Sequence, residues 1–264
     1  YFPYVSKTYN SVTGFNEDKV GAEVFLNTGT GKQINLTLNP DFGQAESDEV
    51  IVNFSAQETF YSEKRAFFNE NQSLFDLSHY DRYRVINTRR IGAASSYDCE
   101  AAYDEGGCNN AKKSYTDIDF ALRYTQKNNN SDFGIFVAQE SDESYTKGRN
   151  FYALRSKSMV GSRSIGYFLT HVVNNFTNEK ATVNVVDFTN IKSDKLTLYN
   201  DILFSEKEGD SGLGIRSQFT YQPTPLVRRS GSILYFEDSF KLNDFGYLKK
   251  ADWFHFGIGS DLTK

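Results

Sequence analysis

Apolar and polar residues alternate along most of the chain from Thr116 onward. Successive side chains of an extended backbone point to opposite sides, so this period of two predicts β-strands with one apolar and one polar face. In the segment TDIDFALRYT, the alternation assigns residues to two faces as follows. The apolar face holds Ile118, Phe120, Leu122 and Tyr124, and the other face holds Asp117, Asp119, Ala121 and Arg123.

The alternating segments are about ten residues long and are separated by short polar turns, which is typical of a meander of antiparallel strands. Helical periodicity is nearly absent. After 116–125 and 133–140, further strands are expected at 151–159, 164–173, 181–189, 195–205, 213–221, 230–236 and 253–259. Two earlier strands, 19–27 and 33–39, are joined by the hairpin sequence Thr28-Gly29-Thr30-Gly31. The pattern therefore predicts about a dozen strands.

Two all-β architectures fit this pattern, a transmembrane β-barrel and a soluble β-sandwich. Strands that cross a bilayer need ~9 to 11 residues, whereas strands of ordinary sheets most often have ~5 to 6. Several charged residues stand opposite apolar ones, as a water-filled or plugged lumen requires. These are Asp119, Arg123, Arg155, Lys157, Asp201 and Arg216. We therefore expect an all-β, antiparallel transmembrane barrel.

Composition supports this choice and excludes one class of partner. Aromatic residues make up 16% of the 264 residues, with 23 Phe and 17 Tyr but one Trp, which suits aromatic girdles at two membrane interfaces. The net charge of −5 leaves no basic surface for a phosphate backbone, so nucleic acid is not expected as a partner. No run of apolar residues is long enough for a membrane helix. No signal peptide is recognised at Tyr1, so the numbering is expected to start in a mature or trimmed chain.

Cys99 and Cys108 are the two cysteines of the chain and lie in the polar segment SSYDCEAAYDEGGCNNAKKS. Their separation fits a local disulfide in an oxidising compartment. It fits a zinc site poorly, because no histidine is nearby in the sequence. We expect a disulfide in a solvated extracellular loop.

The segment from Asn35 to Phe75 is too charged for an ordinary core and too aromatic for an ordinary loop. It resembles the signature of the domain of unknown function 5916 family. That signature has a strand ending in NPDFGQ-x-E-x-D, then an E-x-F-x-x-EKR-x-FF block, then an RRIG strand. The matching positions are Asn39 to Gln44, Glu46, Asp48, Glu58, Phe60, Glu63 to Arg65, Phe67, Phe68 and Arg89 to Gly92. A proline is usual in the family where Glu49, Ser62 and Ala66 stand, and a glycine is usual near Asn71.

The resemblance implies an outer-membrane β-barrel of a Gram-negative bacterium and brings no settled biochemical activity. Members are typically longer, with a carbohydrate-binding domain of the family-nine type ahead of the barrel. The present chain is therefore expected to be part of a larger barrel. The run FEDSFKLNDFGYLKKADW, which contains Asp238, Asn243 and Asp244, resembles a recurrent strand turn of the family and is interpreted as architecture.

Clustered carboxylates could act as acid and base or hold calcium, but basic residues are interleaved with them here. Such sets more often form structural ion networks than active sites. We therefore expect region 40–92 to be an acidic and aromatic plug or brace within the unit 1–264. Its predicted ion network comprises Asp41, Glu46, Asp48, Glu58, Glu63, Lys64, Arg65, Glu70, Arg89 and Arg90. A glycosidase would need two carboxylates ~5 to 9.5 Å apart, for which Glu58, Glu63 and Glu70 are the nominal candidates.

No other motif points to catalysis. His79, His171 and His255 match no metal-binding spacing. Ser78 and His79 are adjacent, so on an extended chain their side chains would point apart. No catalytic residue, metal or cofactor is therefore expected.

The expected function is transport, binding or scaffolding at the outer membrane. Membrane lipid is the expected partner, with a saccharide or an envelope protein as further candidates. A carbohydrate-binding or carbohydrate-active surface protein is one alternative, and a soluble β-sandwich adhesin or enzyme domain is another. Lumen-facing Tyr and Phe rings beside Asn and Asp could bind sugars, but lipid-facing girdles use the same rings.

Overall fold

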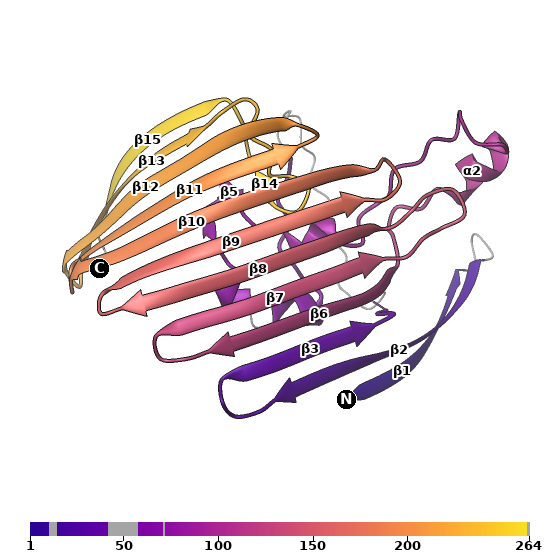
Figure 1. Ribbon diagram of the computed structural model, residues 1–264, viewed down its shortest axis with the longest axis horizontal. Helices are drawn as coiled ribbons and strands as arrows, with labels where there is room; N and C mark the ends of the chain where they lie inside the picture. Colours follow the sequence, from indigo (N-terminus) through magenta and orange to yellow (C-terminus); the bar gives the residue numbers. More distant parts are fainter. Residues whose placement is uncertain (11–14, 42–57, 71, 263–264) are drawn as a thin grey trace.

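The computed structural model describes residues 1–10, 15–41, 58–70 and 72–262. Its main feature is one large curved sheet of twelve strands that follow one another in chain order (Figure 1). Each strand pairs antiparallel with its neighbours. The strands are β1 (Phe2–Asn10), β2 (Phe15–Asn27), β3 (Lys32–Leu38), β6 (Ile118–Lys127), β7 (Ser131–Glu140), β8 (Arg149–Val160), β9 (Arg163–Asn174), β10 (Glu179–Ser193), β11 (Leu196–Lys207), β12 (Asp210–Thr224), β13 (Val227–Phe236) and β15 (Trp253–Leu262).

The predicted all-β antiparallel meander is thus confirmed. The sheet is open, because β1 and β15 stand at its two edges and do not pair with each other. Among the described residues, no helix is long and apolar enough to cross a membrane.

Tight turns join many of the strands. Glu208 and Gly209 link β11 to β12 with φ angles of 50° and 88°. Two consecutive positive φ values belong to the type I′ turn, whose twist matches that of the flanking strands. Glycine takes the second position at no steric cost, since it has no Cβ.

Between β3 and β6 the chain leaves the sheet and packs against one of its faces, where a second segment joins it between β13 and β15. Together we call residues 58–70, 72–92 and 237–252 the inner layer. It contains short elements: α1 (Ala66–Asn69), η1 (Gln72–Leu74), β4 (Ser78–His79), β5 (Tyr83–Arg84), η2 (Thr88–Arg90) and β14 (Tyr247–Leu248). β14, β5 and β4 form a small separate sheet. Figure 1 shows these elements behind the large sheet, whereas α2 (Glu105–Ala111) projects from one end.

Aromatic side chains form the core between the large sheet and the inner layer. Phe68 lies 6.2 Å from Phe136 between ring centroids, and Tyr83 lies 5.6 Å from Phe236. All four residues are at most 3% exposed. Burial of one such ring stabilises the fold by ~1.5 to 3 kcal/mol. Phe68 of the EKR-x-FF block and Tyr83 of β5 therefore supply apolar contacts between the inner layer and the wall.

The two faces of the sheet differ as the alternation predicts. In β12, Ile215 and Phe219 point away from the inner layer, while Gly214 and Arg216 point toward it. One expected assignment in β6 is wrong. Ile118 is buried in the core and Asp119 is exposed, because the register shifts between Ile118 and Phe120 at a β-bulge. A bulge inserts one residue, so residues on its two sides follow opposite parities.

Candidate functional site

The inner face of the large sheet carries a row of charged residues that lie directly opposite one another on neighbouring strands. The row crosses β6 to β12, and we call it the charged row. Its members, in strand order, are Lys127, Asp132, Lys157, Gly166, Asp187, Asp201 and Arg216. Gly166 is the one uncharged member. The antiparallel register thus collects residues that are up to ninety positions apart in the sequence.

Gly166 allows an ion pair to form across its strand. Arg155 on β8 reaches past β9 to Asp187 on β10, with Nη2 3.0 Å from Oδ2. Both residues are 4% exposed. A Cβ at position 166 would lie 2.4 Å from Asp187 Oδ1 and 2.6 Å from Arg155 Nη1. Any side chain there would therefore displace the pair.

A second buried pair ties the wall to the inner layer. Arg216 lies 2.7 Å from Asp201 through Nε and Oδ2, and its Nη2 donates to Oδ1 at 3.1 Å. The hydroxyl of Tyr83 in β5 donates to Asp201, and Arg216 also donates to the carbonyl of Ser78 at 3.3 Å. Burial and the neighbouring Asp201 charge raise the pKa of Tyr83 well above its ordinary value. Tyr83 therefore stays protonated and acts as the donor.

Two more wall arginines bind the backbone of the inner layer. Arg123 donates to the carbonyls of Glu70 and Phe68. Arg149 forms a bidentate pair with Glu140, at 2.7 and 2.8 Å, and donates to the carbonyl of Arg90 at 3.0 Å. Bidentate arginine pairs on carboxylates and carbonyls are strong and directional. The charged inner wall therefore acts as a set of anchors for the inner layer.

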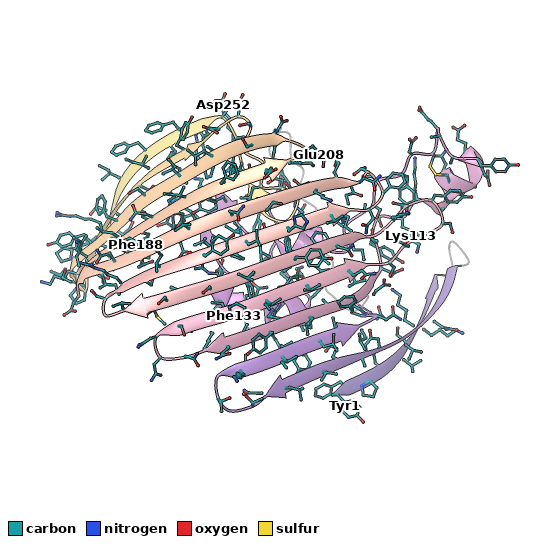
Figure 2. The ribbon with its side chains drawn as sticks, in the orientation of Figure 1. Tyr1, Lys113, Phe133, Phe188, Glu208 and Asp252 are labelled. Atoms are coloured by element: carbon teal, nitrogen blue, oxygen red, sulfur yellow. A yellow bond between two sulfur atoms is a disulfide. The ribbon has the colours of Figure 1, made fainter. Side chains whose placement is uncertain are left out.

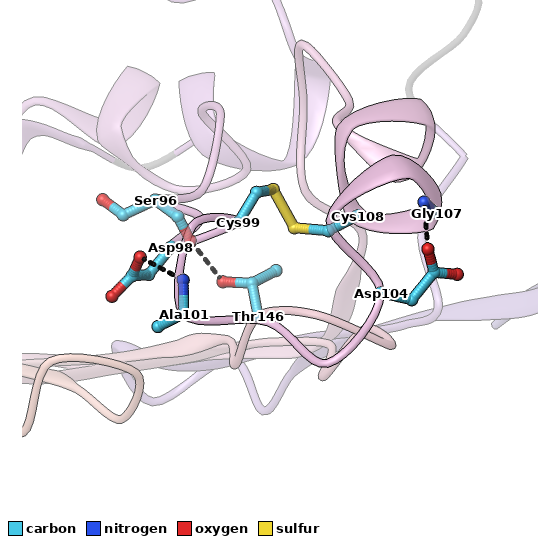
Figure 3. Close-up of a disulfide and its surroundings, with 8 residues drawn as sticks. All are labelled: Ser96, Asp98, Cys99, Ala101, Asp104, Gly107, Cys108 and Thr146. Atoms are coloured by element: carbon cyan, nitrogen blue, oxygen red, sulfur yellow. Dashed lines mark hydrogen bonds between the residues drawn. A yellow bond between two sulfur atoms is a disulfide. The ribbon is translucent and has the colours of Figure 1, made fainter.

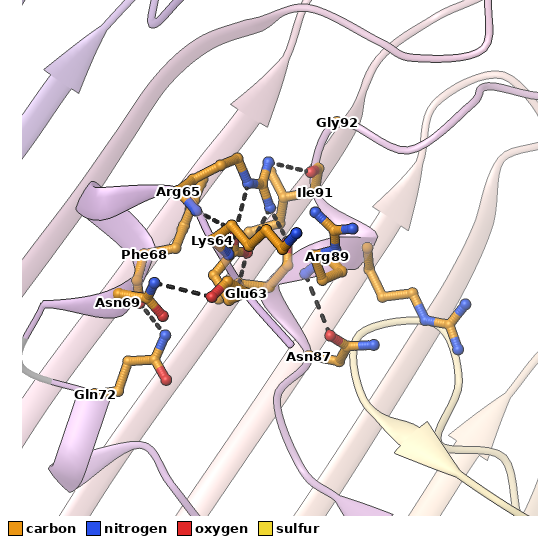
Figure 4. A network of polar contacts seen from close by, with 12 residues as sticks. Glu63, Lys64, Arg65, Phe68, Asn69, Gln72, Asn87, Arg89, Ile91 and Gly92 are labelled. Carbon is orange, nitrogen blue, oxygen red and sulfur yellow. Dashed lines mark hydrogen bonds and ion pairs between the residues drawn. The ribbon is translucent and has the colours of Figure 1, made fainter. Parts of the chain in front are cut away.

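Within the inner layer, Glu63 and Arg65 of the predicted set form a nearly buried ion pair (Figure 4). Glu63 receives Arg65 Nη2 at 2.7 Å and Nε at 2.8 Å, and it also accepts from the Thr88 hydroxyl at 2.7 Å. Arg65 further donates to the carbonyls of Thr88 and Ile91, at 2.7 and 2.8 Å. This pair joins the EKR block to the RRIG segment.

Glu58 and Arg90 form a separate and more exposed pair at 2.6 Å. Arg90 also donates to the carbonyl of Gly246 at 3.1 Å, which links the two parts of the inner layer. Glu63–Arg65 and Glu58–Arg90 are thus two separate ion pairs between described members of the predicted set.

The other predicted members have different positions. Glu70 accepts a hydrogen bond from Asn35 of β3 at 3.1 Å, and the backbone N–H of Asp41 donates to the Tyr4 hydroxyl at 2.7 Å. The backbone N–H of Lys64 donates to Glu63, and that of Arg89 donates to Asn87. Glu46 and Asp48 lie outside the described residues.

Glu63 and His79 are two of the inner-layer groups whose pKa values are shifted. Burial raises the pKa of Glu63, but the hydrogen bonds and charge of Arg65 outweigh it, so this pKa lies below its usual value. Burial, with the charges of Arg216 and Arg82, lowers the pKa of His79 to about 4. Glu63 is therefore ionised and His79 neutral at neutral pH, as expected for structural groups.

Cys99 and Cys108 form a disulfide, as predicted, with Cα atoms 5.5 Å apart (Figure 3). Asp104 caps α2 by accepting from the N–H of Gly107 at 2.9 Å. The Thr146 hydroxyl donates to the Ser96 carbonyl at 2.7 Å and connects this loop to the segment between β7 and β8. The disulfide therefore closes a short loop at one end of the sheet.

The structure offers room for a small molecule at three places beside the inner layer. One cavity of about 280 Å³ lies between residues 73–78 and the charged row. Another of about 200 Å³ lies around Phe60, Asn69 and Arg84. A groove of about 530 Å³ also lies on the inner side of β1 to β3, beside Phe2, Phe25 and Glu70. No group of three or more His, Cys, Asp or Glu is placed to hold a metal ion in the part of the chain that is described.

Sequence reasoning located the charged inner wall but missed its pairing. Arg155, Asp201 and Arg216 were expected to face a lumen, whereas Asp187 and Tyr83 were not singled out. The available signal was an isolated Asp at an inward position of β10, opposite a glycine of β9. An inward carboxylate in a long alternating strand calls for a partner, since an unpaired buried charge is costly.

Comparison with known proteins gives one family match and several distant structural similarities. The family described as domain of unknown function (DUF5916) matches residues 1–118. No curated protein sequence matches the chain. A loop L8 deletion mutant of OmpT, an outer membrane protein of Vibrio cholerae, has 12% identity and a TM-score of 0.39, covering 93% of this chain and 80% of that chain.

In-vitro folded OmpT of the same organism has 11% identity and a TM-score of 0.38, covering 98% of this chain and 93% of that chain. The family match includes the whole motif from Asn39 to Gly92 that carries the resemblance. Residues 1–118 of this chain are therefore similar to the domain of unknown function 5916 family.

Proposed function

We propose that the chain forms the wall and the filled lumen of a β-barrel in the outer membrane of a Gram-negative bacterium. The observation that carries this proposal is the outward face of the sheet. We consider the outward positions of β6 to β12, leaving out the first two and the last two residues of each strand. None of these positions holds Asp, Glu, Lys or Arg. Large exposed apolar residues occupy many of them, including Ile165, Phe188, Ile202 and Phe204.

A water-exposed sheet would not need this arrangement. Monomeric soluble proteins rarely expose contiguous apolar patches larger than a few hundred Å², whereas a lipid-facing barrel surface consists of one. Figure 2 labels Phe133 on β7 and Phe188 on β10, two outward aromatic residues of this surface. The apolar surface therefore supports contact with lipid.

Several outward polar side chains form hydrogen bonds with one another, as a hydrocarbon environment requires. Tyr167 donates to Asn184 at 2.6 Å, and Ser217 donates to Asn200 at 2.9 Å. His171 and Thr182 make a hydrogen bond of 2.9 Å between neighbouring strands. Unsatisfied polar groups cost several kcal/mol in a bilayer core, so these pairs fit a lipid-facing surface.

Packing of the inner layer against the sheet helps to distinguish an open pore from a filled barrel. The inner layer packs on the sheet through buried rings and three arginine anchors, Arg123, Arg149 and Arg216, so the space beside the wall is occupied and not an open channel. This supports ligand binding, gated transport or scaffolding of an envelope partner over free diffusion through a pore. The lateral edges of β1 and β15 also need partners in hydrocarbon, so the proposed barrel is completed by further antiparallel pairing.

Loop lengths suggest an orientation. The turns 28–31, 128–130, 161–162, 194–195 and 225–226 all lie at one end of the sheet and are short. The long connections 39–117, 141–148 and 237–252 lie at the other end. Outer-membrane barrels have short periplasmic turns and longer extracellular loops. The disulfide loop is therefore proposed to face the cell exterior.

The test replaces an outward residue in the middle of β11. Ile202→Arg is expected to disfavour membrane assembly by ~2 to 4 kcal/mol, the cost of an arginine near the bilayer midplane. It should reduce the urea-resistant protein in outer-membrane fractions. The matched control Glu208→Arg, in the turn after β11, should assemble like the unchanged protein. Normal assembly of Ile202→Arg, or a protein that stays dispersed without detergent, would contradict the proposal.

A further inference from the structure

The cavity of about 280 Å³ lies at the short-turn end of the sheet, between residues 73–78 of the inner layer and the charged row. Lys127 ends β6 and Asp132 follows at the start of β7, so both stand beside the 128–130 turn. The aromatic ring of Tyr199 and the hydroxyl-bearing Thr189 line the far side. The cavity therefore combines fixed charges with neutral hydrogen-bonding groups.

Most charges around this cavity are neutralised within the protein. Arg155 pairs with Asp187, and Arg216 pairs with Asp201. Asp76 of the inner layer is paired with Arg84 at 2.7 Å. These pairs form the rigid part of the lining and leave little net charge for a ligand.

Three charges remain without an ion pair in the described structure: Lys127, Asp132 and Lys157. They are consecutive members of the charged row, with Asp132 directly opposite both lysines. Lys127 donates to the hydroxyl of Ser73 at 2.9 Å. The side chains of Asp132 and Lys157 make no hydrogen bond or ion pair with any described residue. The cavity thus offers a cation, an anion and a cation in line.

We infer that this cavity binds a small zwitterion of amino-acid or dipeptide size, with its carboxylate on Lys127 and Lys157 and its ammonium on Asp132. A simple anion would be repelled by Asp132, and a simple cation would be repelled by Lys127 and Lys157. A neutral ligand would desolvate all three charges without compensation, which is costly. Only a ligand with both charges satisfies the set, by charge complementarity.

The volume of the cavity also fits a ligand of amino-acid or dipeptide size. Pockets for drug-sized ligands span ~300 to 1,000 Å³, and this cavity lies just below that range. Tyr199 and Thr189 can supply hydrogen bonds that orient the ligand's backbone groups. The inference rests on the proposed lumen, since it takes the sheet's inner face as the side shielded from lipid.

The test measures binding of three probes to the detergent-solubilised protein by calorimetry. Alanyl-alanine carries both charges, N-acetyl-alanyl-alanine only the carboxylate, and alanyl-alanine amide only the ammonium. Alanyl-alanine is expected to bind at least ~10-fold more tightly than either blocked form, equivalent to ~1.4 kcal/mol. Equal binding of all three probes, or no binding of alanyl-alanine, would overturn the inference.

Two variants test which side chains bind the carboxylate and the ammonium of the ligand. Lys157→Met should weaken alanyl-alanine binding at least tenfold, whereas Lys192→Met, at the exposed 191–195 segment, should leave it unchanged. Asp132→Asn should remove the preference for the free ammonium, so the N-acetylated probe binds as well as alanyl-alanine. An equal loss in Lys192→Met would show nonspecific attraction and overturn the inference.

Loss of binding is distinguished from loss of folding by the electrophoretic mobility of each variant, compared with and without heating. If Lys157→Met no longer shows the mobility of the folded protein, the probe preference of Asp132→Asn alone tests the inference. Absence of dipeptide binding, with membrane assembly still disrupted by Ile202→Arg, would reject the zwitterion site and keep the proposed barrel. Normal assembly of Ile202→Arg would instead reject the barrel.

Discussion

At the residue scale, Gly166 allows two buried charges of the wall to pair because it has no side chain. Gly166 lets Arg155 and Asp187 meet across β9, and a buried charge without its partner would cost several kcal/mol. Sequence alone shows a glycine in a strand, where it ordinarily weakens the strand. The reason for it appears only when the register sets Gly166 opposite Asp187.

We expect Gly166→Ala to lower the free energy of unfolding by ~1 to 3 kcal/mol, the usual cost of overpacking. The added Cβ would overlap the Arg155 and Asp187 side chains. Gly259→Ala is the matched control, because its nearest neighbour would be Ser230 Oγ at 3.7 Å. Denaturant unfolding in detergent measures both variants. Equal stability of the two would show that the ion pair does not depend on the glycine.

At the element scale, faces of strands were predictable and pairings were not. Alternation correctly assigned Leu122 and Arg123 of β6 to opposite faces. It failed at Ile118 and Asp119, where a bulge changes the parity and composition gives no sign of it. The partners of Arg65 could not be read from the sequence either, because the chain must first turn back to bring Thr88 and Ile91 beside it.

Arg65 is expected to be the main polar support of the inner layer. Arg65→Ala removes the partner of a nearly buried Glu63 and leaves two carbonyls without a donor. Loss of one partner from a buried pair costs ~3 to 5 kcal/mol. Arg90→Ala removes a more exposed pair with Glu58 and should cost only ~1 kcal/mol. Unfolding curves compare the two, and similar losses would mean that the Glu63 pair is not a structural support.

At the scale of the whole molecule, the account depends on which side of the sheet meets lipid. The inner face holds buried ion pairs and a packed layer, and the outer face holds exposed apolar residues. A soluble sandwich would cover that outer face with a second sheet, and the described residues place no other element there. The length and alternation of the strands predicted this division, while the position of the inner layer required the structure.

The most direct measurement of this claim is quenching of single tryptophans by brominated phospholipid in reconstituted bilayers, with Trp253 replaced by Phe. Phe188→Trp and Ile202→Trp report on the outward face, and Tyr80→Trp reports on an exposed position of the inner layer. The account predicts strong lipid quenching at positions 188 and 202 and none at position 80. Quenching of Tyr80→Trp alone, or water-like emission from all three, would contradict it.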